Sequence, residues 1–188
     1  MTDRQWTGVV LAGGKSTRMG QDKALMELDG ERMLDRAVRS LRTHAREILV
    51  IGDPAKYASE HATTVPDDAP GKGPLGGIVT ALKHARYVRL IVLACDLPLI
   101  SDRLIHVLKR EMEKDFDAVV PRHSGHIEPL VATYHRRAIE TFDRCLLKEE
   151  LRMSTALGLV RTAYMDVEPG TNGWPKDLFK NMNSPADL

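Results

Sequence analysis

Short runs of apolar residues alternate along this 188-residue chain with longer segments in which apolar positions recur every three or four residues. An unbroken apolar run is typical of a strand that is covered on both faces, as in a parallel sheet. On this pattern we expect strands at residues 7–12, 48–51, 63–65, 90–94, 118–120, 129–134 and 162–167, and a short extended piece at 25–28.

The longer segments carry the period of amphipathic helices. We expect helices at residues 33–41, 78–85, 102–113, 136–147 and 151–159. Ser101 or Asp102 can cap the third of them, because both side chains accept hydrogen bonds from N–H groups of a first helical turn. Residues 66–77 contain so many glycines and prolines that we expect no regular element there.

Strands that alternate with helices indicate a three-layer α/β/α fold around a mostly parallel central sheet. No linker, repeat or low-complexity tract divides the chain, so we expect residues 1–188 to form a single domain. Ligands of such sheets bind beyond the carboxyl ends of the strands. Loops beginning at Gly13, Asp67 and Asp96 each follow a predicted strand, and we therefore expect them to lie along one edge and share a site.

The first of these loops combines glycines with cations, namely Gly13, Gly14, Lys15, Arg18 and Lys23. Glycines let backbone N–H groups approach an anion without a Cβ in the way, and consecutive N–H groups can form an anion-binding concavity. The three cationic side chains could neutralise several phosphate charges at once. The loop therefore predicts a phosphate-binding site.

Composition restricts the class of partner. Hydrophobic residues make up 43% of the chain and charged residues 28%, and the net charge is +1, so we expect neither nucleic acid nor a membrane as a partner. No apolar stretch is long enough to span a bilayer, and residues 1–6 lack the apolar core of a signal peptide. Cys95 and Cys145 are the only cysteines, which excludes a disulfide framework and favours a cytoplasmic location.

Asp96 comes directly after a predicted buried strand, where an unpaired carboxylate is costly. Mg²⁺ takes oxygen ligands and usually shares them with substrate phosphates, so one or two protein carboxylates suffice. We interpret Asp96 as a magnesium ligand, with a helix cap or a salt bridge as the ordinary alternative. No Cys-His-Asn/Asp arrangement surrounds the neighbouring Cys95, which favours a small buried filler over a nucleophile.

Asp67 and Asp68 stand at the start of the second loop. A carboxylate can accept hydrogen bonds from both N1–H and the exocyclic amine of guanine, in the bidentate manner in which it binds arginine. Asp67 and Asp68 are the two candidates for such a contact. For either residue, an Asx-turn is the competing structural interpretation.

His123, His126 and Glu128 suggest a comparison with zinc sites. Their spacing is not that of a helical ligand pair, and no cysteine accompanies them. A solvated loop is the better interpretation of these three residues.

Residues 11–23 resemble the signature Leu-Ala-Gly-Gly-x-Ser-x-Arg-Met-Gly-x-Asp-Lys of the molybdenum cofactor guanylyltransferases, the MobA family. The resemblance implies a Rossmann-like nucleotidyltransferase fold, similar to that of the nucleotide-diphospho-sugar transferases. It implies catalytic roles for Arg18, Lys23 and Asp96. It also implies nucleotide-binding roles for Leu11, Ala12, Gly13, Gly14, Lys23, Asp67 and Asp96.

Later segments extend the resemblance. Residues 95–98 are similar to a Cys-Asp-x-Pro stretch whose Asp binds magnesium in the family. Residues 73–77 are similar to its Gly-Pro-Leu-x-Gly loop, and this resemblance implies that Gly76 contacts a substrate. Asn181 and Asn183 lie in a segment similar to Asn-x-Asn-Thr-Pro, which implies contact with substrate or with the waters of the metal. Their alternative role is to cap a helix that begins at Pro185.

Two further segments bear on the resemblance. Residues 128–130 fall where family members carry a Pro-Leu stretch near the pterin site, which makes this loop a candidate for substrate contact. Gly52 and Asp53 stand where some relatives carry an asparagine that touches the nucleotide, so this contact is in doubt, with Asp53 as a candidate replacement.

The resemblance implies a Mg²⁺-dependent guanylyltransferase that transfers GMP from GTP to molybdopterin and releases pyrophosphate. It also implies transient contact with cofactor-synthesis proteins and with acceptor molybdoenzymes. A molybdopterin cytidylyltransferase and a sugar-phosphate nucleotidyltransferase are the alternative enzymes. A non-catalytic nucleotide sensor is the alternative from another class, and the basic loop and Asp96 argue against it because a pure binder could dispense with the metal.

Overall fold

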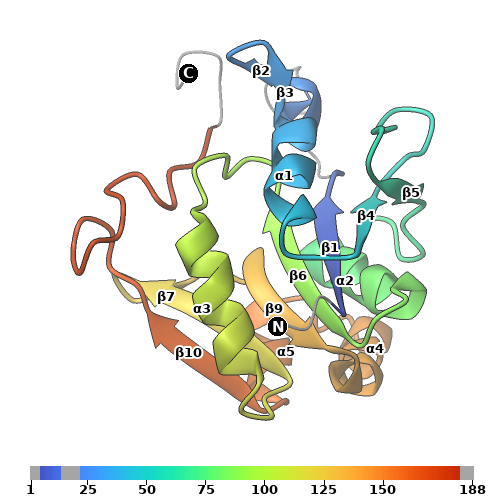
Figure 1. Ribbon diagram of the computed structural model, residues 1–188. Helices are drawn as coiled ribbons and strands as arrows, with labels where there is room; N and C mark the ends of the chain where they lie inside the picture. The colour runs from blue at the N-terminus through green and yellow to red at the C-terminus, as the bar shows by residue number, and fades with distance from the viewer. Residues whose placement is uncertain (1–4, 14–21, 183–188) are drawn as a thin grey trace.

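The computed structural model describes residues 5–13 and 22–182 of the chain. Its centre is an eight-stranded sheet with the order β10-β7-β9-β6-β1-β4-β5, in which β8 pairs with β7 (Figure 1). The strands are β1 (Trp6–Leu11), β4 (Glu47–Ile51), β5 (Thr63–Val65), β6 (Arg89–Ala94), β7 (Ala118–His123), β8 (His126–Ile127), β9 (Val131–His135) and β10 (Thr162–Asp166). A separate hairpin joins β2 (Glu27–Leu28) to β3 (Glu31–Arg32).

Most neighbours in the sheet are parallel. β1 pairs in parallel with β4 and β6, β4 with β5, and β7 with β10. β9 runs antiparallel to both β6 and β7. The predicted mostly parallel sheet is therefore confirmed, and each strand expected from the apolar pattern is present.

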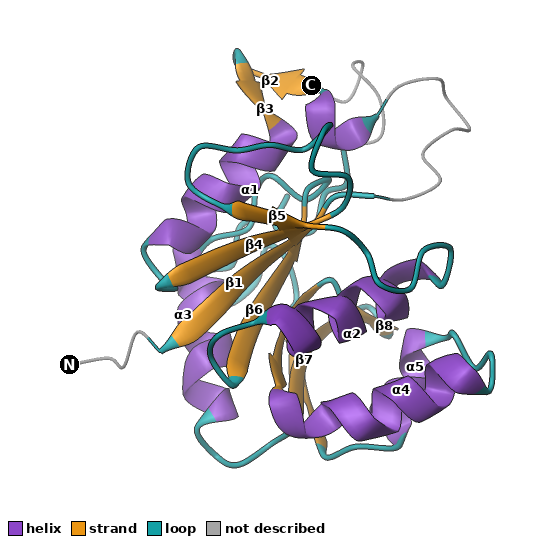
Figure 2. Cartoon of the chain, turned by 90° about the vertical axis from the view of Figure 1, so that its right-hand side faces the viewer, coloured by secondary structure: helices purple, strands orange, loops and turns teal. Residues whose placement is uncertain are grey.

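Helices cover both faces of the sheet, which confirms the three-layer arrangement (Figure 2). They are α1 (Met33–Arg42), α2 (Gly73–His84), α3 (Asp102–Met112), α4 (Ile139–Leu147) and α5 (Met153–Gly158), with short 3₁₀ turns η2 (Lys23–Leu25) and η3 (Arg136–Ala138). α1 and α3 bury Leu34 and Leu104 in one hydrophobic core. α2 and α4 bury Ile78 and Phe142 in a second core on the opposite face.

α2 begins at Gly73, five residues before the predicted start, so the expectation of no regular element throughout residues 66–77 was wrong. Pro74 lies in the first turn, where its missing N–H costs no helical hydrogen bond. The glycines serve packing: a Cβ at Gly76 would lie 2.7 Å from the Ala69 carbonyl oxygen, and one at Gly77 would lie 3.1 Å from Leu11 Cδ2. Glycine thus lets the helix start close to its preceding loop and to β1.

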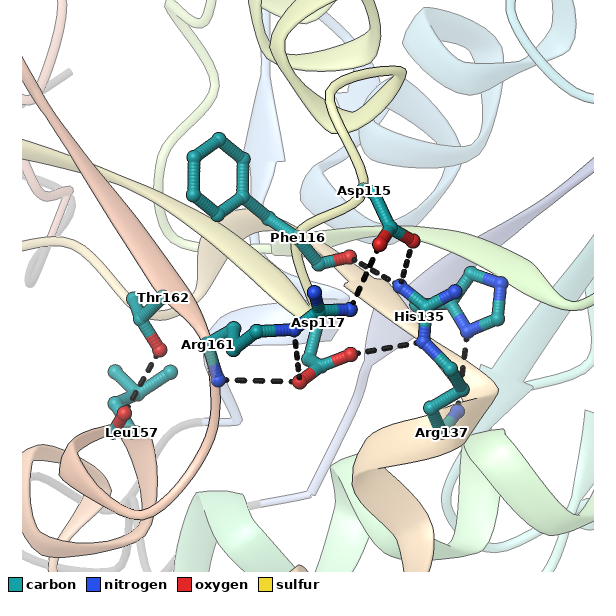
Figure 3. A network of polar contacts seen from close by, with 8 residues as sticks. All are labelled: Asp115, Phe116, Asp117, His135, Arg137, Leu157, Arg161 and Thr162. Atoms are coloured by element: carbon teal, nitrogen blue, oxygen red, sulfur yellow. Dashed lines mark hydrogen bonds and ion pairs between the residues drawn. The ribbon is translucent and has the colours of Figure 1, made fainter.

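A polar network ties together β7, β9 and β10 at their Asp117 end (Figure 3). The Asp117 carboxylate accepts hydrogen bonds from Arg137 Nε at 2.9 Å and from the Arg161 backbone N–H at 3.1 Å. Asp115 contacts the guanidinium groups of the same two arginines, at 2.9 and 3.0 Å. Asp117 precedes β7, so the network lies at the sheet edge opposite to the carboxyl ends of the parallel strands and supports the fold rather than the site.

Candidate functional site

The carboxyl ends of four parallel strands are level with one another. Leu11 is in register with Ile51 on one side and with Ala94 on the other, and Ile51 is in register with Val65. The loops that follow β1, β5 and β6 therefore leave the sheet at one edge, as the sequence predicted. This is the edge at which ligands of parallel α/β sheets bind.

Lys23 and Asp96 meet at this edge although 73 residues separate them. Lys23 Nζ lies 3.3 Å from Asp96 Oδ2, and each side chain is 26% exposed. The structure thus brings together the lysine of the first loop and the predicted metal-binding carboxylate. The ordinary alternative for Asp96, a salt bridge, is present as well, and the partial exposure of both groups leaves them accessible to a ligand.

Cys95 is part of the support for Asp96. Its side chain is buried, and its Sγ donates to the Leu11 carbonyl oxygen at 3.7 Å. Burial, together with the nearby Asp96 and Asp22 carboxylates, raises the pKa of the Cys95 thiol to about 12. Because the thiolate is the nucleophilic form, this neutral thiol acts as a small buried residue, as the sequence indicated.

The end of the described chain lies against Asp96. The Met182 N–H donates to the Asp96 carbonyl oxygen at 2.9 Å, and the Met182 side chain is buried. Asn181, the residue before Met182, is exposed. The assignment of Asn181 to the site remains a prediction.

The loop around Glu128 reaches the same edge. The Ala94 N–H donates to the Leu130 carbonyl oxygen at 2.8 Å, which joins the start of β9 to the end of β6. His123 Nε2 lies 2.8 Å from Glu128 Oε1, and the His123 ring stacks on Phe179 with centroids 4.6 Å apart. Leu130 therefore lies beside the end of β6, and a substrate contact by residues 128–130 remains a prediction.

His123 and His126 lie in the β7–β8 hairpin, and Glu128 follows it. His126 lies opposite His123 in the β7–β8 hairpin and is exposed. Within residues 5–13 and 22–182, no three His, Cys, Asp or Glu side chains are grouped closely enough to hold a metal ion. His123 and His126 lie in strands β7 and β8, so the expectation of a solvated loop was wrong for these two residues. The His123 side chain contacts Glu128 and Phe179.

Asp67 and Asp68 have separate partners. Asp67 Oδ1 accepts hydrogen bonds from the Ala69 N–H and the Thr80 hydroxyl, both at 2.9 Å, which is the Asx-turn foreseen as the structural alternative. Asp68 is exposed, and its Oδ2 lies 3.0 Å from His84 Nε2. A base contact by Asp67 remains a prediction, and these bonds show that its Oδ1 is already used.

Gly52 permits a close approach between two strand ends. A Cβ at Gly52 would lie 2.1 Å from the Ala12 carbonyl oxygen and 2.7 Å from Tyr57 Cδ2. Glycine at this position is thus required by packing. Asp53 is exposed, and its Oδ1 accepts a hydrogen bond from the Ala55 N–H at 2.9 Å, so it stabilises the following turn.

Sequence reasoning missed a cluster around Asp22. Asp22 Oδ1 accepts from the Ala24 N–H at 3.1 Å, and its Oδ2 accepts from the Tyr57 hydroxyl at 2.6 Å and forms an ion pair with Lys56. Partial burial raises the pKa of Asp22, but the hydrogen bonds from Lys56, Tyr57 and Ala24 outweigh it and lower that pKa overall. The only sequence signal was the position of Asp22 within the first motif.

Four residues of the predicted site lie outside the described part of the chain: Gly14, Lys15, Arg18 and Asn183. Leu11, Ala12 and Gly13 are described and lead from β1 into the site edge. Gly76 lies in the first turns of α2. The roles assigned to these residues remain predictions.

The sequence profile of the family described as "MobA-like NTP transferase domain" matches residues 8–162. A relative from Pelotomaculum thermopropionicum, named "Probable molybdenum cofactor guanylyltransferase", is 36% identical over 98% of this chain and 90% of its own length. A relative of the same name from Carboxydothermus hydrogenoformans is 34% identical over 96% of this chain and 92% of its own length. A crystal structure titled "Molybdopterin-guanine dinucleotide biosynthesis protein A" from Archaeoglobus fulgidus superposes with a TM-score of 0.80 at 25% identity, covering 96% of this chain and 94% of the other.

Proposed function

Because the chain belongs to the MobA-like NTP transferase family, we propose that it is a Mg²⁺-dependent molybdenum cofactor guanylyltransferase. It transfers GMP from GTP to molybdopterin, which yields the guanine dinucleotide cofactor and pyrophosphate. The observation that carries this proposal is the Lys23–Asp96 pair at the level strand ends. A cation and a carboxylate at one accessible point suit a reaction between two phosphate-bearing substrates.

Asp96 fits a magnesium ion by the chemistry of its donor atoms. Lys23 contacts Oδ2, and among the described residues no partner of Oδ1 is found. Mg²⁺ is commonly held by one or two carboxylates together with substrate phosphates and water. When bound, the ion supplies neutralisation of the phosphate charge that develops during transfer.

The residues of the chain position the reactants and offset their charge. A phosphate oxygen of molybdopterin attacks the α-phosphorus of GTP, the bond between that phosphorus and its β-bridging oxygen breaks, and pyrophosphate leaves. Lys23 and Arg18 bind the triphosphate, and the backbone of Gly13 and Gly14 holds it at the end of β1. No side chain serves as a nucleophile, so the rate depends on positioning and on preorganised charge.

The remaining site residues act on the two substrates. Asn181, Asn183 and Gly76 orient molybdopterin and the nucleotide. Asp67 accepts from guanine through Oδ2, since Oδ1 already accepts two hydrogen bonds. Leu11 and Ala12 bring the end of β1 against the nucleotide.

The setting of the enzyme belongs to the same proposal. It works as a single domain in the cytoplasm, and it contacts cofactor-synthesis proteins and acceptor molybdoenzymes transiently. In the described part of the chain no helix is long and apolar enough to cross a membrane.

Pyrophosphate release tests the proposal when it is measured with molybdopterin and each of GTP, CTP, ATP and UTP. We expect release with GTP and Mg²⁺, dependent on molybdopterin. Release with CTP at the same rate would favour a molybdopterin cytidylyltransferase. Release only when a sugar phosphate replaces molybdopterin would favour a sugar-phosphate nucleotidyltransferase. Tight nucleotide binding without release from any mixture would favour the non-catalytic sensor.

A further inference from the structure

Asp22 joins two parts of the site edge that are distant in sequence. It precedes Lys23 and caps η2, because its Oδ1 accepts from the Ala24 N–H at 3.1 Å. Its Oδ2 accepts from the Tyr57 hydroxyl at 2.6 Å and forms an ion pair with Lys56. The turn that carries Lys23 is therefore held from the loop after β4.

Tyr57 is fixed in its own loop. The residue is 6% exposed, and its ring lies so close to Gly52 that a Cβ there would be 2.7 Å from Tyr57 Cδ2. Its N–H donates to the Asp53 carbonyl oxygen, and its carbonyl accepts from the Thr64 hydroxyl, both at 2.9 Å. Burial and the Asp22 carboxylate raise the pKa of Tyr57, so its hydroxyl stays a hydrogen-bond donor at neutral pH.

Lys23 follows Asp22 directly, so a constraint on the Asp22 side chain also constrains the backbone from which Lys23 reaches Asp96. We propose that Tyr57 and Lys56 are positioning residues, which act through Asp22 to hold the Lys23 ammonium beside Asp96. The inference rests on the proposed function, in which Lys23 binds the nucleotide triphosphate. Neither Tyr57 nor Lys56 needs to touch a substrate for this role.

A double-mutant cycle separates positioning from simple structural support. Tyr57→Phe removes only the hydroxyl that reaches Asp22. Thr64→Val is the matched control, because it removes a hydrogen bond to the backbone of the same Tyr57 and leaves the Asp22 contact in place. Lys56→Met is the second variant, and the Lys56 side chain is 47% exposed, so we expect little change in the free energy of unfolding.

The dissociation constant of Mg²⁺–GTP, measured by calorimetry on the full chain, is the readout, with the melting temperature recorded for each variant. We expect Tyr57→Phe to raise this dissociation constant by about three- to tenfold, which corresponds to the loss of one net hydrogen bond. Lys56→Met should act in the same direction, and Thr64→Val should leave it unchanged. In a Lys23→Ala background, Tyr57→Phe should have no further effect, since coupled residues are not additive.

Two results would overturn the inference: an undiminished effect of Tyr57→Phe in the Lys23→Ala background, or an equal effect of Thr64→Val. The proposed function fails separately. If the parent binds another nucleoside triphosphate instead of GTP, the guanylyltransferase proposal is wrong, and the same cycle measured with that nucleotide still decides the role of Tyr57. If Tyr57→Phe does not fold, Lys56→Met in the parent and in the Lys23→Ala background tests the same inference.

Discussion

Replacement of Asp117 by asparagine should destabilise the fold, whereas the same replacement of Asp115 should not. Both carboxylates contact Arg137 and Arg161 (Figure 3). They differ in setting, because the Asp117 side chain is 14% exposed and that of Asp115 is 64% exposed. The pair therefore offers one chemical change in two environments.

The expected loss can be worked out from the contacts. Asp117 accepts from Arg137 Nε and from the Arg161 N–H, and a hydrogen bond to a charged group contributes about 1.5–3 kcal/mol. Asparagine keeps one acceptor oxygen, so we expect Asp117→Asn to lower the free energy of unfolding by about 2 kcal/mol. For a chain of this size such a loss lowers the melting temperature by about 4–8 °C. At Asp115 the solvent screens the charges, and the unfolding free energy should stay nearly unchanged.

The loss should also depend on pH. Partial burial raises the pKa of Asp117, but the hydrogen bonds from Arg137 and Arg161 and the charges of both arginines lower it overall. A carboxyl group whose pKa is lower in the folded state stabilises the fold above its unfolded pKa of about 3.9, and the contribution disappears as the pH falls through the folded pKa. The difference in the free energy of unfolding between the parent and Asp117→Asn should be fully present at pH 7. It should shrink as the pH falls below the pKa of the carboxyl group in the unfolded chain.

Urea unfolding, monitored by circular dichroism, measures both the loss at pH 7 and its dependence on pH. A change in the urea midpoint without a change in the slope m reports a change in the free energy of unfolding. The reasoning would be refuted by equal losses for Asp117→Asn and Asp115→Asn at pH 7. It would also be refuted by a parent–variant difference that persists in acid below the folded pKa of Asp117.

Two further predictions concern the nucleotide. Lys23→Ala and Arg18→Ala should each weaken GTP binding by about 1.5–3 kcal/mol, the contribution of one charge-assisted contact, with little change in melting temperature; unchanged affinity in calorimetry for both variants would remove them from the triphosphate site. Asp67→Asn should lower kcat/KM for GTP and narrow the preference over CTP and ATP, because unpaired buried polar groups discriminate strongly; unchanged selectivity in the pyrophosphate assay would move base recognition to Asp68 or to the backbone.

The sequence predicted the layers and the site edge because these follow from local patterns. Apolar runs place the strands, and polar loops after three of them meet at one edge once the strands are parallel. The shared edge of the loops that follow β1 and β6 results from this rule, since the two strands are neighbours. The direct contact of Lys23 with Asp96 was not predicted.

Part of what the sequence did not predict depends on contacts between distant segments. The early start of α2 was missed because its glycines and proline were interpreted as loop residues, although Pro74 suits a first helical turn. The space that Gly76 and Gly77 leave for Ala69 and Leu11 is a packing feature that local propensity does not report. The Tyr57 contact with Asp22 spans 35 residues without any repeated spacing. Tertiary geometry alone brings these groups together.

The roles of Asp67 and His123 could not be decided from the sequence, because they depend on contacts that the fold creates. The position of Asp67 at the start of the second loop allowed either a contact with the guanine base or an Asx-turn. Its hydrogen bonds from Ala69 and Thr80 show the Asx-turn, and they do not exclude a contact with the base. His123 could be assigned to a loop, but its stacking on Phe179 joins residues far apart in the sequence. Side-chain partners of this kind are fixed by the fold.

The most direct test of the central claim follows the α-phosphorus of GTP in the parent and in Asp96→Ala. With α-labelled GTP, Mg²⁺ and molybdopterin, we predict that the parent transfers the label to the pterin product and that γ-labelled GTP leaves its label in pyrophosphate. Asp96→Ala should fold, as judged by circular dichroism, and should transfer no label. Transfer by Asp96→Ala within a few-fold of the parent at saturating Mg²⁺ would contradict the account.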